Sequence, residues 1–155
     1  MELSKPWLDL EGYKKTRMLE AEYEAELAER FLRQGLVRNA AGKAFQAWKA
    51  LMGAMLADKV AELERLYPGS VEIKEGRRVK KAYWILALVP TTLMKELSQL
   101  LGREAVLATS LALQIHQYNG PDREGVLSPY RNEESARGDV QILIDIVKEF
   151  LSRYK

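Results

Sequence analysis

Apolar residues recur every third or fourth position along most of the chain, and strict two-residue alternation is nearly absent. Because that spacing places apolar side chains on one face of a helix, the pattern predicts an all-α protein. The predicted helices cover approximately residues 13–34, 39–66, 77–88, 91–101, 104–118 and 133–154. Most connections between them are short, which favours antiparallel neighbours. We therefore expect an up-and-down bundle of four to five main helices.

Glycine, proline and capping residues mark several helix ends. Gly35 stands where a left-handed residue would end the first helix, and Asn39 is a suitable N-cap for the second. The second helix is the longest and should end at the turn 67–69 (Tyr-Pro-Gly), so we expect it to be the spine of the fold. The link that follows contains Val-Glu-Ile at 71–73, which favours an isolated extended piece.

The same periodicity predicts which side chains face the core. We expect inward positions at Ala21, Tyr23, Ala25, Leu27, Ala28, Phe31, Leu32, Leu107 and Tyr154, among others. Gly53 lies inside the second helix, where glycine costs about 1 kcal/mol relative to alanine. With Ala50, Ala54 and Ala57 it forms a small-residue strip that lets another helix approach closely. Packing within the chain is the favoured interpretation, and a seam between subunits is the alternative.

Length and composition restrict the classes of function. The chain has 155 residues, which predicts one domain with residues 1–12 as an N-terminal segment. Without cysteine, and with His116 as the single histidine, the chain offers no disulfide, thiolate metal site or histidine cage. We expect no metal and no cofactor. The longest apolar run, 82–90, is too short to cross a membrane, so we expect a cytoplasmic protein without membrane contact. The scarcity of Asn and Cys with abundant Glu and Arg hints at a thermophilic source.

The connection before the last helix is unusually long and chemically varied. We expect an ordered loop over 119–132, with Tyr118 and Tyr130 as aromatic anchors that hold it to the bundle. One interpretation is a packed cover with no other role. The other is a site for a phosphate-bearing or other anionic ligand, lined by Tyr118, Asp122, Arg123, Tyr130 and Arg131.

A basic cluster lies at the start of the third predicted helix. It contains Arg77, Arg78, Lys80 and Lys81, with Lys74 just before them and Glu75 as the opposing charge. Cations at a helix N-terminus oppose the macrodipole, so tolerating them there points to an anionic partner such as nucleic acid. The net charge is only +2, and a solvated face is the favoured interpretation.

His116 is the natural candidate for a general base, because its reference pKa lies near neutrality. No carboxylate lies three or four residues from it to orient the ring. We therefore favour a packed or C-terminal capping histidine, and we assign no catalytic residue.

Two stretches resemble a known superfamily. Residues 38–56 (RNAAGKAFQAWKALMGAML) resemble the small-residue, Lys-containing second helix of HEPN-type domains, and residues 108–147 resemble its archaeal PaREP-type branch. The resemblance implies a helical bundle that often dimerises and in some members binds nucleotides or cleaves RNA. The RNA-cleaving members resemble one another in an Arg, a polar residue and a His a few residues further on. Arg131-Asn132 matches the start of that motif, but no His occurs in 133–139.

Three hypotheses follow. The first is a non-catalytic HEPN-like module that forms a homodimer and binds a nucleotide or RNA, using Tyr118, Tyr130, Arg131, His116 and Lys43. Lys43 is included because a cation early in the second helix is disfavoured by the macrodipole. The second is a homodimeric structural or protein-interaction module without a small-molecule ligand. The third is a weak ribonuclease that uses His116 and Arg131 in trans.

Overall fold

The protein is described by a computed structural model that covers residues 4–118, 120 and 129–154. Its helices are α1 (Leu10–Arg33), α2 (Val37–Leu56), α3 (Val60–Leu66), α4 (Lys81–Leu88), α5 (Met94–Ser98), α6 (Arg103–His116) and α7 (Glu133–Ser152). Two short strands, β1 (Ser70–Glu72) and β2 (Arg78–Lys80), form a hairpin. Single 3₁₀ turns occupy 57–59, 74–76, 91–93 and 99–101. The predicted helical class is confirmed, with this small hairpin as an addition.

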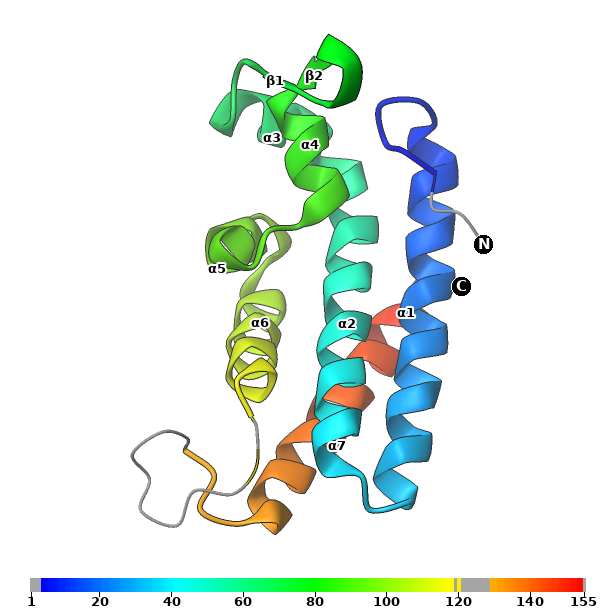
Figure 1. The fold of residues 1–155 in the computed structure, drawn as a ribbon, viewed down its shortest axis with the longest axis vertical. Helices are drawn as coiled ribbons and strands as arrows, with labels where there is room; N and C mark the ends of the chain where they lie inside the picture. Colours follow the sequence, from blue (N-terminus) through cyan, green and yellow to red (C-terminus); the bar gives the residue numbers. More distant parts are fainter. Residues whose placement is uncertain (1–3, 119, 121–128, 155) are drawn as a thin grey trace.

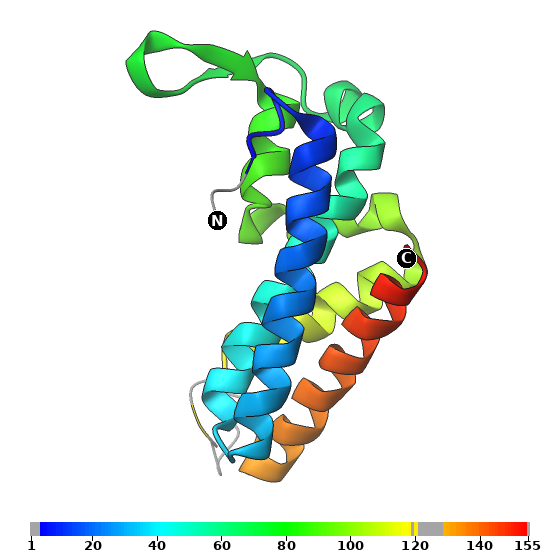
Figure 2. The ribbon, with the colours of Figure 1, turned by 90° about the vertical axis from the view of Figure 1, so that its right-hand side faces the viewer.

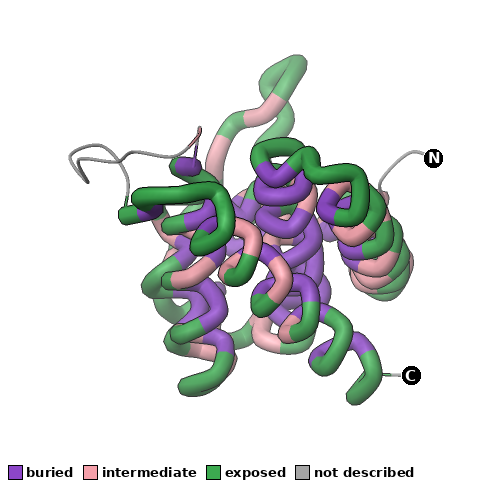
Figure 3. Tube along the Cα trace, turned by 90° about the horizontal axis from the view of Figure 1, so that it is seen from below, coloured by how far each residue is buried: buried purple, intermediate pink, exposed green. Residues whose placement is uncertain are grey.

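The long helices α1, α2, α6 and α7 make up the body of the molecule. In Figure 1, α1 runs downward, α2 returns upward beside it, α6 runs downward, and α7 crosses behind on its way back up. In Figure 1, the hairpin, α3 and α4 lie at the upper end of α2, and α5 lies beside α2 above α6. Seen along the long axis, the buried positions of these helices face one another and the exposed positions face outward (Figure 3). α2 is the most deeply buried helix, in agreement with its predicted role as the spine.

Gly53 lets α1 pack closely against α2 within the same chain. A Cβ placed on Gly53 would lie 2.9 Å from the Tyr13 hydroxyl and 3.1 Å from Arg17 Nε. The neighbouring Ala50, Ala54 and Ala57 are also buried. The small-residue strip is therefore used inside the chain, as favoured, and the alternative of a subunit seam at this strip is wrong.

The turn between α1 and α2 is tighter than predicted. Gly35 has φ +78°, and the amides of Gly35 and Leu36 donate to the carbonyls of Leu32 (3.1 Å) and Phe31 (2.9 Å). This is a Schellman-type helix end, as expected for Gly35. Because the chain turns within these residues, α2 already begins at Val37. Asn39 therefore lies in the first turn of α2, and its predicted N-cap role is wrong.

The predicted spine is interrupted after residue 56. A 3₁₀ turn over 57–59 separates α2 from α3, and it presents Asp58 to α1, where Lys14 Nζ bonds its carboxylate at 2.8 Å. A 3₁₀ turn of this length interrupts the i,i+4 hydrogen bonds but keeps apolar residues at helical spacing, so the periodicity does not reveal it.

The third predicted helix starts later than expected. Residues 78–80 pair with 70–72 in an antiparallel register that places Val71 opposite Val79, and α4 begins only at Lys81. The Val-Glu-Ile segment is thus extended, but it is paired rather than isolated. Arg77 and Arg78 do not lie in a helix at all, so the macrodipole argument for the basic cluster is wrong for both.

Three side chains predicted to face the core point outward instead. Tyr23, Leu107 and Tyr154 are 62%, 64% and 45% exposed. α1 buries a narrow, mostly small row that includes the predicted Ala21, Ala25, Ala28 and Leu32, and Tyr23 lies on the other side of the helix. Periodicity alone did not distinguish this row from the apolar residues beside it.

Candidate functional site

His116 ends α6 and stacks on Phe45 of α2. The two ring centroids are 3.9 Å apart with an interplanar angle of 17°, while Phe45 is buried and His116 is exposed. The histidine is thus packed on one face, as favoured from the sequence, and its other face is open to solvent. An aromatic ring held flat on a buried neighbour is a ready stacking surface for a planar ligand.

A polar groove of about 450 Å³ lies on the outer face of α2 near its N-terminus. It is lined by Arg38, Asn39, Gly42, Lys43 and Gln46. Gly42 lies one helical turn before Phe45, the residue on which the His116 ring stacks. No acidic residue occupies the first turn of α2, and no side chain caps its start. The groove is therefore cationic and rich in hydrogen-bond donors.

Lys43 has a carboxylate close by on α1. Its Nζ lies 3.4 Å from Glu24 Oε2, and that oxygen is buried and accepts no hydrogen bond within the described part of the chain. The contact is an ion pair without a well-formed hydrogen bond, so part of the charge on Lys43 remains available to the groove. The side chain of Arg38 makes no hydrogen bond or ion pair with a described residue.

Tyr118 and Tyr130 anchor the two ends of the long connection. They are 7% and 4% exposed and meet edge to face with centroids 5.5 Å apart. The Tyr130 hydroxyl donates to Asp139 Oδ2 at 2.7 Å. Burial, followed by this hydrogen bond, raises the pKa of Tyr130 well above its usual range. Both residues therefore serve as the predicted aromatic anchors.

The start of α7 accounts for the residues that follow Tyr130. Asn132 is the N-cap, and its Oδ1 accepts from the Ser135 amide at 2.9 Å. Arg131 is exposed just before it. Of the predicted loop 119–132, residues 119 and 121–128, with Asp122 and Arg123, lie outside the described residues.

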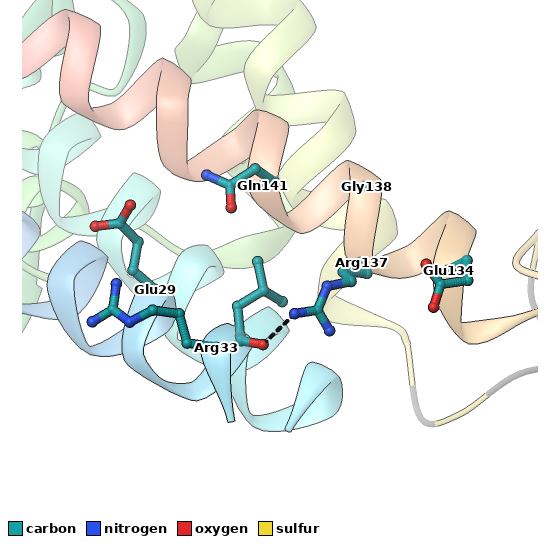
Figure 4. Close-up of a pocket in the computed structure, with 7 residues that line it drawn as sticks. Glu29, Arg33, Glu134, Arg137, Gly138 and Gln141 are labelled. Carbon is teal, nitrogen blue, oxygen red and sulfur yellow. Dashed lines mark hydrogen bonds between the residues drawn. The ribbon is translucent and has the colours of Figure 1, made fainter. Parts of the chain in front are cut away.

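A second hollow, of about 330 Å³, separates the end of α1 from the start of α7 (Figure 4). Arg137 reaches across from α7, and its Nη2 donates to the Leu32 carbonyl at 2.6 Å. Arg137 thereby satisfies a carbonyl that the end of α1 leaves free. Glu29, on the α1 side, is paired with Lys148. These charges join the two helices, so we assign this hollow a structural role.

The basic cluster is divided by the hairpin. Arg78 donates to Ser70 Oγ (3.0 Å), and Lys80 pairs with Glu64 (3.2 Å). Arg77 and Lys81 are exposed, and their side chains make no hydrogen bond or ion pair with described residues. The hairpin and the end of α6 lie at opposite ends of the molecule (Figure 1), so the cluster is remote from His116.

The predicted site residues thus fall into separate places. Tyr118 and Tyr130 meet each other, His116 lies on α2 through Phe45, and Lys43 faces α1. Sequence reasoning missed Arg38, Gln46 and the stacking partner Phe45. The sequence did contain a signal for the groove: polar residues recur three and four positions apart on a mostly apolar helix. These residues are Arg38, Asn39, Gly42, Lys43 and Gln46.

Two further findings concern partners. Within residues 4–118, 120 and 129–154, histidine and carboxylate side chains do not gather in groups of three or more that could hold a metal ion. Over the same described residues, every helix is too short or too polar to span a bilayer.

These features define a predominantly α-helical protein with a cationic groove on its central helix and a His116–Phe45 stack between α6 and that helix. The model of the archaeal PaREP1/PaREP8 family matches residues 16–141, so the chain belongs to that family. No curated protein and no solved structure matches the chain.

Proposed function

We propose that this chain is a non-catalytic, HEPN-like binding module for a nucleotide or RNA, and that the ligand occupies the α2 groove beside His116. The observation that carries the proposal is the exposed His116 ring lying flat on buried Phe45 at 3.9 Å. A base would stack on the open face of that ring. Base–aromatic stacking of this kind contributes about 1–3 kcal/mol per base.

The groove supplies the complementary groups for the rest of a nucleotide. Arg38 and Lys43 provide positive charge for phosphate, and Asn39 and Gln46 provide amides for hydrogen bonds to base or sugar. The N-terminal end of α2 adds the partial positive charge of its macrodipole. Of the residues predicted from the sequence, the proposal assigns His116 to stacking of the base and Lys43 to the groove. It assigns the exposed Arg131, just before α7, to a phosphate, and it gives Tyr118 and Tyr130 no contact with the ligand.

Calorimetric titration with mononucleotides and short single-stranded RNA tests the proposal. His116→Ala should weaken binding roughly five- to a hundredfold, which corresponds to the stacking energy above. His116→Tyr should retain most of the affinity, because it keeps an aromatic face. Arg103→Ala, at the start of α6, is the matched control and should bind like the wild type. Absence of binding in the wild type, or equal affinity in all four proteins, would contradict the proposal.

The weak ribonuclease remains a second, lesser candidate for the same residues. It requires His116 as a proton-transfer group and Arg131 for phosphate. The His116→Tyr protein distinguishes the two, because it keeps the stacking surface but lacks the imidazole. RNA cleavage by the wild type that is lost in His116→Tyr would favour the ribonuclease. Binding without cleavage favours the non-catalytic module. The interaction-module hypothesis depends on other surfaces, the apolar strip around Gly53 and the last helix near Tyr154. The strip is buried within the chain, whereas Tyr154 is 45% exposed.

A further inference from the structure

The outer side of α1 carries a continuous exposed stripe. Its members recur every three or four residues along the helix: Glu11, Lys15, Leu19, Tyr23, Glu26 and Arg30. At the centre, Leu19 and Tyr23 are 55% and 62% exposed. Figure 2 looks onto this side of the molecule, and no described element lies in front of α1 along its length. The stripe is therefore an uncovered helix face with an apolar centre.

The charged side chains of this stripe form no hydrogen bond or ion pair with another described residue. They are Glu11, Lys15, Glu26 and Arg30. Other charges of α1 are paired, as Lys14 is with Asp58 and as the carboxylates at 24 and 29 are with lysines. Several charged residues of α1 are thus paired, whereas those of the outer stripe have no hydrogen-bonded or ion-paired partner in the described part of the chain.

The order of the charges along the stripe is self-complementary. A negative and then a positive residue (Glu11, Lys15) precede the apolar centre, and a negative and then a positive residue (Glu26, Arg30) follow it. The centre of the stripe lies near residue 21. Reversing the helix about that point brings Lys15 opposite Glu26, Glu11 opposite Arg30, and Leu19 opposite Tyr23. A parallel copy in register would instead place each charge against its own kind, which is destabilising.

We propose that a second copy of this chain docks on the outer side of α1, with the two α1 helices antiparallel across a two-fold axis near Leu19 and Tyr23. Such an isologous contact uses the same patch on both copies, as a two-fold dimer requires. Each copy contributes Lys15 and Glu11 to one half of the interface and Glu26 and Arg30 to the other. The charges set orientation and register, and the apolar centre supplies the burial.

A neighbouring groove extends the apolar centre. It has a volume of about 470 Å³, and its apolar lining comes from Met18 and Leu19 of α1 and from Leu151 and Tyr154 at the end of the chain. Tyr154 is 45% exposed there. In the antiparallel arrangement, the exposed Tyr23 of the second copy faces this groove.

The proposal does not depend on nucleotide binding.

Charge reversal offers a test with an internal rescue, measured by sedimentation velocity over a wide range of concentration. The wild type should dimerise.

The single variants Lys15→Glu and Glu26→Lys each place like charges at two symmetry-related contacts. Each should therefore raise the dimer dissociation constant roughly tenfold or more. An equimolar mixture of these two variants restores opposite charges at both contacts and should form a heterodimer. The double variant, with both reversals in one chain, should regain the homodimer.

Arg103→Glu is the matched control, since it makes the same change of charge on an exposed position of α6 and should dimerise like the wild type. His116→Ala should also leave dimerisation unchanged, so failure of this proposal is separate from failure of nucleotide binding. A monomeric wild type at all concentrations would overturn the proposal. So would single variants that dimerise as well as the wild type, or a mixture and double variant that stay monomeric while circular dichroism shows them folded.

Discussion

The Tyr13 hydroxyl lies directly over Gly53, at a distance of 2.9 Å from the position that a Cβ would occupy. The hydroxyl donates to the Leu86 carbonyl at 2.5 Å and accepts from Arg17 Nε at 3.0 Å. Arg17 in turn donates to the Ala87 carbonyl at 3.0 Å. Two side chains of α1 thereby satisfy the carbonyls that end α4, and a glycine in α2 leaves the space for them. This point joins α1, α2 and α4 through residues that are far apart in the sequence.

Gly53→Ala should destabilise the protein, although alanine is the better helix former. The propensity gain is about 1 kcal/mol. It is offset because the new methyl displaces a hydroxyl that two hydrogen bonds hold in place, and overpacking typically costs about 1–3 kcal/mol. Gly42→Ala and Gly138→Ala are matched controls in helices with open space at the Cβ, and both should be stabilising. Urea unfolding measures all three. A more stable Gly53→Ala protein would show that the contact is not tight.

Thr109→Val should destabilise the core by about 1–3 kcal/mol. Trp48 is fully buried on α2, and its indole N–H donates to Thr109 Oγ1 of α6 at 2.9 Å. Valine preserves the shape of threonine but leaves that donor without an acceptor. Thr109→Ser keeps the oxygen and should cost less than valine in the same unfolding experiment. If serine were the more destabilising of the two, the missing methyl rather than the hydrogen bond would dominate.

The raised pKa of Tyr67 predicts a loss of folding stability at high pH. Burial, followed by a hydrogen bond to the Glu96 carboxylate, raises its pKa to about 12. The folded state therefore holds the phenol proton more tightly than the unfolded state, where the pKa is about 10. The resulting stabilisation is complete below about pH 10 and is lost as the pH rises from about 10 to about 12. Unfolding free energies over this range should fall more steeply for the wild type than for Tyr67→Phe. Parallel curves would contradict the assignment.

The fold was largely predictable because burial follows helical spacing in this chain. Gly35 and the alanine row of α1 were correctly placed from local signals. The hairpin was not predicted, because it depends on the pairing of residues 70–72 with residues 78–80. The local sequence around Arg77 does not reveal that pairing. The outward direction of Tyr23 likewise depends on which face of α1 the rest of the chain covers.

The candidate site was less predictable than the fold. His116 was singled out as the chain's one histidine. Its partner Phe45 lies far away in the sequence, and the apolar pattern predicted Phe45 to be an ordinary core residue. Tyr118 and Tyr130 were recognised as anchors because they bracket the long connection. The contact between them depends on how α6 and α7 meet, which spacing does not encode.

The basic cluster predicts a dependence on ligand length. Arg77 and Lys81 are exposed and have no side-chain partner among the described residues, at the end of the molecule opposite to His116. The Arg77→Ala/Lys81→Ala double variant should therefore bind RNA oligomers more weakly and with a smaller salt dependence. Its affinity for a mononucleotide should be unchanged, because one nucleotide does not reach both ends. Equal losses for both ligands would contradict a separate role for the cluster.

The most direct test of the account uses the fact that the chain has one histidine, whose ring protons give a single identifiable set of NMR signals. During titration with a mononucleotide, stacking of a base on His116 should move these signals upfield and to saturation. The Arg38→Ala protein should need more ligand to reach the same shift. Ring signals that stay in place while the ligand demonstrably binds would show that His116 does not carry the base.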